Sequence, residues 1–379
     1  MTDKEQQSPQ ATAELQAIRQ KIDGLDEQIQ ALLVQRAVCA LEVATIKQAG
    51  VDFMDARQGV VFYRPEREAQ VLKTIMSRPC SPLQPEDMAR LFREIMSTCL
   101  ALEQPMHIAY LGPQGTFTEA AAIKHFGRAV QGVPLATIDE VFREVESGAS
   151  QFGVVPVENS SEGMVNHTLD CFMQSNLHIC GEVELRIHHH FLKSDLTRVD
   201  QITRVYAHQQ TLAQCRQWLD AHYPSVARVA VSSNAEAARR IKGEWHSAAI
   251  AGDMAAERYN LEFIAKNIED NPDNTTRFLM LGRQQPEPCG DDKTSIIVSV
   301  KDRPGALHAL LEPLMSRGIS MTRLETRPAS AVKWSYVFFI DFLGHQNEQH
   351  IHDALEVIEQ DANFVRRLGS YPRSILGVG

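Results

Sequence analysis

The chain has 379 residues, of which 44% are hydrophobic and 23% charged, a composition typical of a globular protein with two or three domains. Its formal net charge of −10, without any run of lysines and arginines, argues against a nucleic-acid-binding protein. The seven cysteines are scattered without a Cys-x-x-Cys pair, so the sequence predicts neither a disulfide framework nor a zinc site.

The N-terminal residues 1–12 are polar and are expected to form a flexible tail. They lack the apolar run of a signal peptide. No later segment contains the roughly 18 apolar residues of a membrane helix. The sequence therefore predicts a cytoplasmic protein.

Residues 13–104 are predicted to be entirely helical. Apolar residues recur at intervals of three or four from Leu15 to Ile46, which indicates one stripe along a single long helix. A second helix is expected to begin near Pro65, because proline is favoured in the first helical turn. A third is expected to run from Pro85 toward Glu103.

The apolar stripe of the long helix is interrupted by a cation, Arg36. A lone buried cation is costly, so an anionic partner is expected. Lys47 follows eleven residues later, which is about three helical turns and therefore the same face. The two side chains are placed to bind a small anion between them. The alternative is an ion pair with a glutamate, for which there are three candidates: Glu27, Glu42 and Glu68.

This helical segment resembles the all-helical chorismate mutases over residues 12–104. The pattern Leu-x-x-Ile-Arg-x-x-Ile-Asp-x-Leu-Asp-x-x-Ile, which begins at Leu15, carries the resemblance together with five charged residues: Arg36, Lys47, Arg67, Glu68 and Glu103. The chain departs from the family at Arg64, where Asp is frequent, and at Cys99, where Ser is frequent. The resemblance implies a six-helix dimer of intertwined chains in which Arg19, Arg36 and Arg67 bind the carboxylates of chorismate, Lys47 and Glu103 contact its ether oxygen, and Glu68 binds its hydroxyl.

Residues 105–285 alternate short β-branched runs with helical segments, which predicts an α/β domain. Three of its loops are polar: Gly112–Phe117, Pro156–Gly163 and Asp273–Phe278. The first is a glycine turn before a helix N-terminus, which suits an anion, although each loop taken alone also fits a structural turn. The run His188–His190 is not predicted to bind a metal, because adjacent residues of a strand point to opposite faces.

Taken together and in this order, the motifs Gly-Pro-x-Gly-Thr-Phe, Val-Pro-x-Glu-Asn and Thr-Arg-Phe resemble prephenate dehydratase across residues 106–283. The resemblance implies two α/β lobes, arranged like a periplasmic binding protein, with the active site in the cleft. It implies catalytic roles for Thr276, Glu158 and Asn159. Either Glu158 or a water chain would supply the proton for the leaving hydroxyl. Substrate-binding roles fall to Thr116, Gln210 and Arg277.

Residues 286–379 begin with a polar linker and continue in the order βαββαβ, which predicts a ferredoxin-like α+β domain. The motif Gly305-Ala306-Leu307 starts its first helix, and Glu325-Thr326-Arg327-Pro328 ends a strand. With these motifs the domain resembles the ACT domain, which binds amino acids at subunit interfaces. The alternative is a purely structural dimerisation module. The resemblance implies an allosteric phenylalanine bound by Gly305, Ala306, Leu307, Glu325 and Arg327.

The three resemblances together imply an enzyme that converts chorismate to prephenate and prephenate to phenylpyruvate, with feedback inhibition by phenylalanine. No cofactor or metal is expected, and the predicted assembly is a homodimer or a dimer of dimers. A non-catalytic amino-acid sensor is the main alternative, but it would not need Arg36, Lys47 and Glu103. A mutase fused to a prephenate dehydrogenase would need a dinucleotide fingerprint, which the turn Gly112–Gly115 does not provide.

Overall fold

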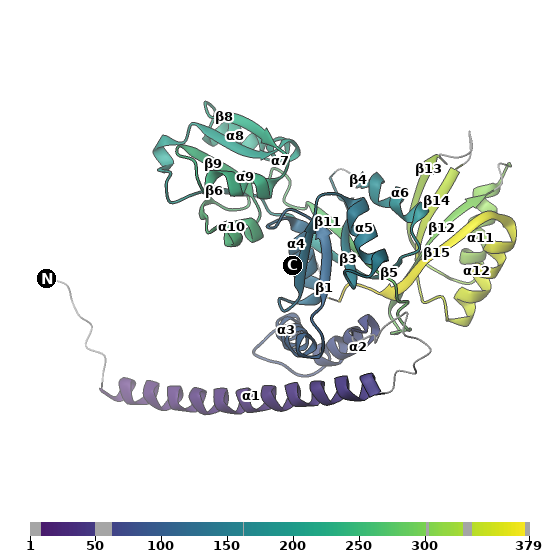
Figure 1. Cartoon of the computed structure of the whole chain (residues 1–379), viewed down its shortest axis with the longest axis horizontal. Helices are drawn as coiled ribbons and strands as arrows, with labels where there is room; N and C mark the ends of the chain where they lie inside the picture. Colours follow the sequence, from purple (N-terminus) through teal and green to yellow (C-terminus); the bar gives the residue numbers. More distant parts are fainter. Residues whose placement is uncertain (1–8, 50–62, 162, 301–302, 329–335, 376–379) are drawn as a thin grey trace.

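The computed structural model describes residues 9–49, 63–161, 163–300, 303–328 and 336–375. Figure 1 shows a long N-terminal helix, a central α/β body, a second α/β lobe on one side of that body and an antiparallel sheet on the other. The multidomain architecture predicted from the sequence is therefore confirmed.

Three helices make up the N-terminal domain: α1 (Pro9–Ala49), α2 (Pro65–Met76) and α3 (Pro85–Glu103). Both shorter helices begin with proline, which lacks the N–H that a first turn leaves unpaired. The predicted apolar stripe of α1 is largely uncovered. Between 44% and 63% of the surface of each of its first six members is exposed, namely Leu15, Ile18, Ile22, Leu25, Ile29 and Leu32.

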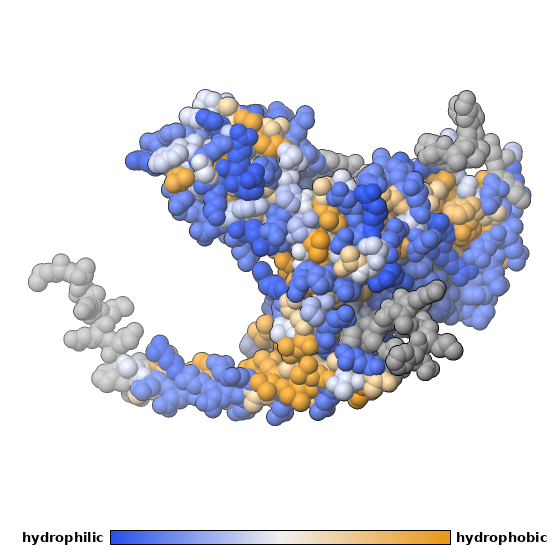
Figure 2. Space-filling model, in the orientation of Figure 1, coloured by the Kyte–Doolittle hydropathy of each residue, from blue (hydrophilic) through white to orange (hydrophobic). Residues whose placement is uncertain are grey.

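Helix α1 is long and apolar enough to span a membrane by length and composition, since a window within Thr12–Ala49 has a mean hydropathy of 1.5. This corrects the expectation that no segment reaches that threshold. The expectation counted strictly apolar residues, whereas the average over a window tolerates the charges of Arg36 and Glu42 among many aliphatic side chains. Figure 2 shows the apolar surface concentrated where α1 approaches the rest of the chain.

The central lobe is built on a six-stranded sheet with the order β2-β1-β3-β11-β5 and the short β4 beside β3. Strands β1, β2 and β3 are parallel, whereas β11 runs antiparallel to both of its neighbours. The strands are β1 (His107–Leu111), β2 (Gln131–Leu135), β3 (Phe152–Asn159), β4 (Gly163–Met164), β5 (His178–Arg186) and β11 (Thr275–Gly282), and the helices are α4 (Phe117–Phe126), α5 (Ile138–Ser147) and α6 (Asn166–Gln174).

The chain leaves the central lobe after β5, forms the second lobe, and returns as β11. The second sheet has the order β10-β6-β9-β7-β8. Two chain crossings between two lobes give the predicted architecture of a periplasmic binding protein. The second lobe contains β6 (His190–Lys193), β7 (Arg204–His208), β8 (Ala227–Val231), β9 (Ser247–Ala251) and β10 (Glu262–Ala265), with a 3-10 turn (Val199–Gln201), α7 (Gln209–Gln214), α8 (Arg216–His222), α9 (Asn234–Ile241) and α10 (Asp253–Tyr259).

The C-terminal domain has the predicted βαββαβ order and an antiparallel sheet β13-β14-β12-β15. Alternate residues of β12 divide between two cores. Ile296 and Val298 pack with the domain's own helices, whereas Ile297 packs with Leu279 and Leu281 of the central lobe. The sheet is therefore docked on that lobe. Its elements are β12 (Asp292–Val300), α11 (Ala306–Ser316), β13 (Met321–Pro328), β14 (Tyr336–Leu343), α12 (Gln349–Asp361) and β15 (Ala362–Pro372).

Candidate active sites

A cleft with a cavity volume of about 590 Å³ lies between the two lobes. The central lobe lines it with the loop before α4, the end of β3 and the start of β11, and the second lobe with residues near the N-termini of α7 and α9. Four of the six predicted dehydratase residues lie here: Thr116, Asn159, Gln210 and Thr276.

The centre of the cleft wall is a hydrogen-bonded group on β3 and β11. The amide nitrogen of Asn159 donates to Thr276 Oγ1 at 2.8 Å and to Asn274 Oδ1 at 3.0 Å. Asn274 is almost fully buried, and Thr276 is 8% exposed. Because Thr276 Oγ1 accepts the Asn159 bond, its own proton remains available to a ligand in the cleft.

A β-bulge decides which side chain of β3 reaches this group. Thr276 pairs with Asn159 and Arg277 with Glu158, but Phe278 pairs with Pro156, so Val157 is an extra residue in β3. Because of the bulge, Val157 and Glu158 both lie on the face of the sheet toward the C-terminal domain. Asn159 then points into the cleft.

Two predicted dehydratase residues therefore lie outside the cleft. Glu158 forms an ion pair with Arg323 of β13. Arg277 is buried between Glu182, at 2.8 Å, and Asp341, at 2.7 Å. Since Thr276 occupies the cleft face of β11, the next residue must point to the opposite face. We accordingly withdraw Glu158 as a catalytic residue and Arg277 as a prephenate-binding residue.

No lysine or arginine lines the cleft in the part of the chain that the structure describes. Positive potential comes instead from helix N-termini in both lobes. Thr116 caps α4 by accepting a bond from the Glu119 amide, and Ser233 caps α9 by accepting one from the Glu236 amide. Both capping residues line the cleft. The remaining free N–H groups of each first turn suit a carboxylate.

Sequence reasoning missed several polar residues of the cleft, among them His189, Ser233 and Asn274. Asn274 stands two residues before Thr276, so the period of two in an extended chain was a signal for it. His189 Nε2 donates to the side-chain oxygen of Gln214 at 2.9 Å. Burial lowers the pKa of His189, which keeps the ring neutral. Its neighbours in the histidine run turn elsewhere, as strand alternation predicts, and contact carboxylates of Glu269 and Asp253.

In the helical domain, the structure brings two of the six predicted mutase residues together. Lys47 Nζ at the end of α1 lies 3.7 Å from Glu103 Oε2 at the end of α3. Arg36 is half-buried on α1 and makes no ion pair with the three candidate glutamates within the described residues. Arg19 and Arg67 are exposed to solvent.

Glu68, the predicted ligand of the chorismate hydroxyl, takes part in a domain contact. Its carboxylate accepts a bond at 3.0 Å from Arg93, whose guanidinium also donates to the carbonyl of Lys124 in the central lobe. Burial raises the pKa of Glu68, against the lowering effect of Arg93. The side chain is thus turned toward the central lobe, which argues against the predicted contact with the chorismate hydroxyl.

The two motifs of the C-terminal domain differ in their surroundings. Gly305 caps α11 with φ of +80°, and a side chain added there would meet open space. Leu307 is partly exposed beside it. On β13, Arg327 binds Asp170 of α6 at 2.7 Å and the carbonyl of Asn166. The second motif therefore contacts the central lobe.

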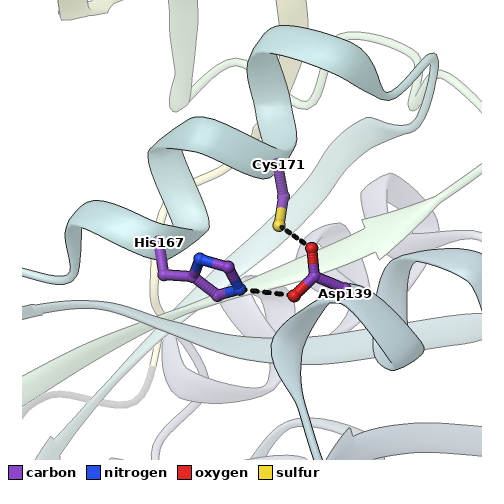
Figure 3. A group of neighbouring side chains, drawn as sticks. All are labelled: Asp139, His167 and Cys171. Atoms are coloured by element: carbon purple, nitrogen blue, oxygen red, sulfur yellow. Dashed lines mark hydrogen bonds and ion pairs between the residues drawn. The ribbon is translucent and has the colours of Figure 1, made fainter.

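A further cluster lies outside the cleft, between α5 and α6 (Figure 3). His167 Nε2 is 2.5 Å from one oxygen of Asp139, and Cys171 Sγ is 3.6 Å from the other. Burial, and then the charge of Asp139, raises the pKa of Cys171 to about 12. Both carboxylate oxygens are occupied, and the Asp139 and His167 side chains are half exposed. We assign this cluster no catalytic or metal-binding role.

Three family models match consecutive parts of the chain: chorismate mutase type II over residues 18–104, prephenate dehydratase over 108–286 and the ACT domain over 294–360. The first match includes most of α1, which makes this apolar helix an element of the mutase domain.

Relatives of known activity match nearly the whole chain. The bifunctional chorismate mutase/prephenate dehydratase of Pseudomonas aeruginosa is 61% identical over 96% of this chain and 99% of its own. That of Neisseria gonorrhoeae is 48% identical over 94% of this chain and 97% of its own. Among solved structures, the prephenate dehydratase of Arthrobacter aurescens in complex with L-Phe is 34% identical, with a TM-score of 0.67 over 72% of this chain and 92% of that one.

Proposed function

This chain belongs to the family of bifunctional chorismate mutase/prephenate dehydratases, and from that premise we propose which of its residues perform the two reactions. The protein converts chorismate to prephenate by a Claisen rearrangement, and prephenate to phenylpyruvate by decarboxylation and loss of the ring hydroxyl. Both steps belong to phenylalanine biosynthesis.

We propose Thr276 as the group that hydrogen-bonds the leaving hydroxyl of prephenate. As the carboxylate leaves as CO₂, its bonding electrons enter the ring, the ring becomes aromatic, and the hydroxyl departs as water after gaining a proton. Asn159 binds Thr276 Oγ1 and so directs the threonine proton into the cleft. With Glu158 outside the cleft and His189 neutral, solvent water is the proton source we propose.

Prephenate carries two carboxylates, and we propose that they bind the N-termini of α4 and α9. These ends belong to different lobes, and their capping residues Thr116 and Ser233 both line the cleft. A helix N-terminus offers free N–H groups and the positive end of the dipole, which compensates for the lack of a lining cation. Gln210 is placed to contribute a side-chain amide from the second lobe.

The Asn159–Thr276 hydrogen bond at the wall of the cleft is the observation that carries this assignment. Its first test is to incubate the purified protein with chorismate and to follow prephenate and phenylpyruvate in time. We expect prephenate to appear first and phenylpyruvate to follow. Formation of prephenate alone would contradict an active dehydratase cleft.

For the mutase we propose Arg36 as a carboxylate ligand, and Lys47 and Glu103 of the same chain as the two groups at the ether oxygen. A Claisen rearrangement needs no nucleophile. It needs a folded dianion and positive or hydrogen-bonding groups where charge develops as the C–O bond breaks. Arg67 and Arg19 remain proposed carboxylate ligands, and both are exposed.

Replacing Glu103 tests whether a hydrogen-bonding side chain is needed at the ether oxygen beside Lys47. Glu103→Ala removes that group and is expected to lower the mutase kcat by a factor of about 100 to 1,000. Glu103→Gln keeps the length of the side chain and supplies an amide N–H donor, so it should retain much more activity than the alanine variant. Glu86→Ala, on an exposed turn of the same helix, is the matched control. If Glu103→Ala keeps the wild-type kcat, Glu103 is not the donor.

We propose a homodimer as the smallest active assembly. The exposed apolar stripe of α1 is too extensive to remain in water and, as in the helical mutases that the chain resembles, a second copy of this helix would cover it. A dimer of dimers is the larger alternative, and sedimentation measurements distinguish the two. We also propose that the protein works in the cytoplasm, where its thiols remain reduced.

We propose phenylalanine as an allosteric inhibitor bound by the C-terminal domain, since the Arthrobacter aurescens relative was solved with L-Phe. The expected ligands are the backbone of Gly305–Leu307 and the strand motif with Glu325 and Arg327. Phenylalanine should inhibit the dehydratase by favouring one conformation.

Replacing Glu325 by alanine is expected to raise the phenylalanine concentration needed for half-inhibition about tenfold, the size of an ordinary allosteric coupling. Glu312→Ala on the exposed face of α11 is the control and should leave inhibition unchanged. Titration calorimetry gives an independent readout. A wild-type protein that shows no heat of phenylalanine binding would remove the hypothesis.

A further inference from the structure

We propose that four charged residues at the joint between the dehydratase lobe and the C-terminal domain are positioning residues for the dehydratase reaction. They are Glu158, Arg277, Arg323 and Asp341, called here the interdomain quartet. Through it, the docked C-terminal sheet holds Thr276 and Asn159 in register. This inference rests on the proposed role of Thr276.

On the dehydratase side, the quartet residues stand directly behind the catalytic pair. Thr276 and Asn159 face each other across β11 and β3, and Arg277 and Glu158 are the next pair in the same ladder. Adjacent residues of a strand point to opposite faces. Each cleft residue is therefore adjacent in sequence to a charged residue on the opposite face of the sheet, Thr276 to Arg277 and Asn159 to Glu158.

On the C-terminal side, the two remaining members are also opposite one another, since Arg323 of β13 pairs with Asp341 of β14. Each contacts the residue of opposite charge on the facing sheet. Arg277 Nη1 lies 2.7 Å from Asp341 Oδ2, and Arg323 is ion-paired with Glu158. Two cross-strand pairs of opposite orientation thus meet face to face.

Further buried groups fix the geometry of Arg277. Its Nε donates to Glu182 at 2.8 Å and its Nη2 to the hydroxyl of Tyr371 at 3.0 Å. Lys293 of the C-terminal domain binds the same Glu182 carboxylate at 2.8 Å. Burial opposes the charge of Arg277, but Tyr371, Asp341 and Glu182 together raise its pKa. The guanidinium stays charged, and because it is buried it is stable only when its hydrogen-bond and ion-pair partners are in place.

Such a network tolerates little displacement. If the C-terminal sheet shifts, Arg277 either moves with Asp341 or is left as a buried charge without that partner, which is strongly destabilising. The network therefore favours a shift in which β11 and β3 follow the C-terminal sheet, and the hydrogen bond between Asn159 and Thr276 connects those same strands. Through the quartet, the position of the C-terminal sheet determines the alignment of β3 and β11 in the central lobe.

Strand β13 connects the quartet to the proposed phenylalanine motif. Glu325 and Arg327 lie two and four residues beyond Arg323 and so share its face of the strand. Arg327 binds Asp170 of α6, and Gly163–Val165, just before that helix, line the cleft. A ligand that moves β13 would act on two parts of the central-lobe wall of the cleft, the strands β3 and β11 and the segment before α6.

The experiment exchanges the charges of the more exposed pair, in which 36% of the Glu158 side chain and 15% of the Arg323 side chain are exposed. The variants Glu158→Arg, Arg323→Glu and their combination are compared in the full-length protein. Dehydratase kcat and KM are measured with and without phenylalanine. Mutase activity of the same sample reports correct folding.

Each single variant is expected to lower dehydratase kcat about tenfold, with little change in KM, and to weaken phenylalanine inhibition. The double variant should recover most of both properties. Arg228→Glu, which breaks an exposed ion pair with Asp220 in the second lobe, is the matched control and should retain the wild-type kcat. If the two single variants act independently, the relative kcat of the double variant equals the product of their relative kcat values. The proposal is wrong if the double variant does not exceed that product, or if the single variants retain the wild-type kcat.

Two further measurements keep the outcomes distinct. Loss of both activities would show that a reversed charge unfolds the chain. In that case the neutral variants Glu158→Gln and Arg323→Gln are used instead, and the relative kcat of their double variant must again exceed the product of the two single values.

Thr276→Ala is measured in parallel. If it remains active, the proposed role of Thr276 fails, whereas a failed rescue with an inactive Thr276→Ala variant contradicts the quartet alone.

Discussion

Replacing Thr276 by alanine is expected to lower the dehydratase kcat by a factor of about 100 to 1,000, the usual effect of removing one preorganised hydrogen-bond donor from a site where charge develops. The mutase rate should not change, because Lys47 and Glu103 lie in a separate helical domain. Steady-state assays with chorismate and with prephenate, on the same protein sample, measure both rates.

Two substitutions make this test specific. Thr276→Ser keeps the hydroxyl and should restore most of the activity. Thr275→Ala removes the same atoms from the adjacent residue, which points away from the cleft wall, and should be close to wild type. A soluble Thr276→Ala protein that loses both activities would contradict two separate sites, and one that retains dehydratase activity would contradict the role of Thr276.

The helices and the domain order were predictable because their signals are local. Proline at the start of α2 and α3 and the apolar repeat of α1 depend only on nearby residues. The repeat also predicted a buried stripe, yet the stripe is exposed in a single chain. Periodicity identifies the face of a helix that avoids water, but it does not identify the chain that covers this face.

The cleft was only partly predictable, because its composition depends on one inserted residue. Simple alternation along Val-Pro-Val-Glu-Asn does not indicate the bulge at Val157, which reverses the faces of Glu158 and Asn159. The position of Arg277 depends in turn on Asp341, which lies far away in sequence. A sequence motif shows which residues are near one another in the chain, whereas the register of the strands, including the bulge, determines which of them lie on the same face of the sheet.

The separate helical site leads to a second prediction of large effect, which concerns the origin of Arg19. Seventeen residues separate Arg19 from Arg36, a rise of about 25 Å on a straight helix that leaves the two on different faces. One small dianion cannot touch both. Lys47 and Glu103 meet within one chain, so Arg36, Lys47 and Glu103 belong to one protomer and Arg19 must come from its partner.

Mixing Arg19→Ala chains with Lys47→Ala chains is therefore expected to restore mutase activity that both parents lack. Each heterodimer contains one intact site, built from Lys47 of the first chain and Arg19 of the second, so random exchange should activate about a quarter of all sites. A mixture of Lys47→Ala and Glu103→Ala chains is the control. It should stay inactive, because those two residues lie in the same chain and every site keeps a defect. If the first mixture, after verified subunit exchange, is as inactive as its parents, the shared site does not exist.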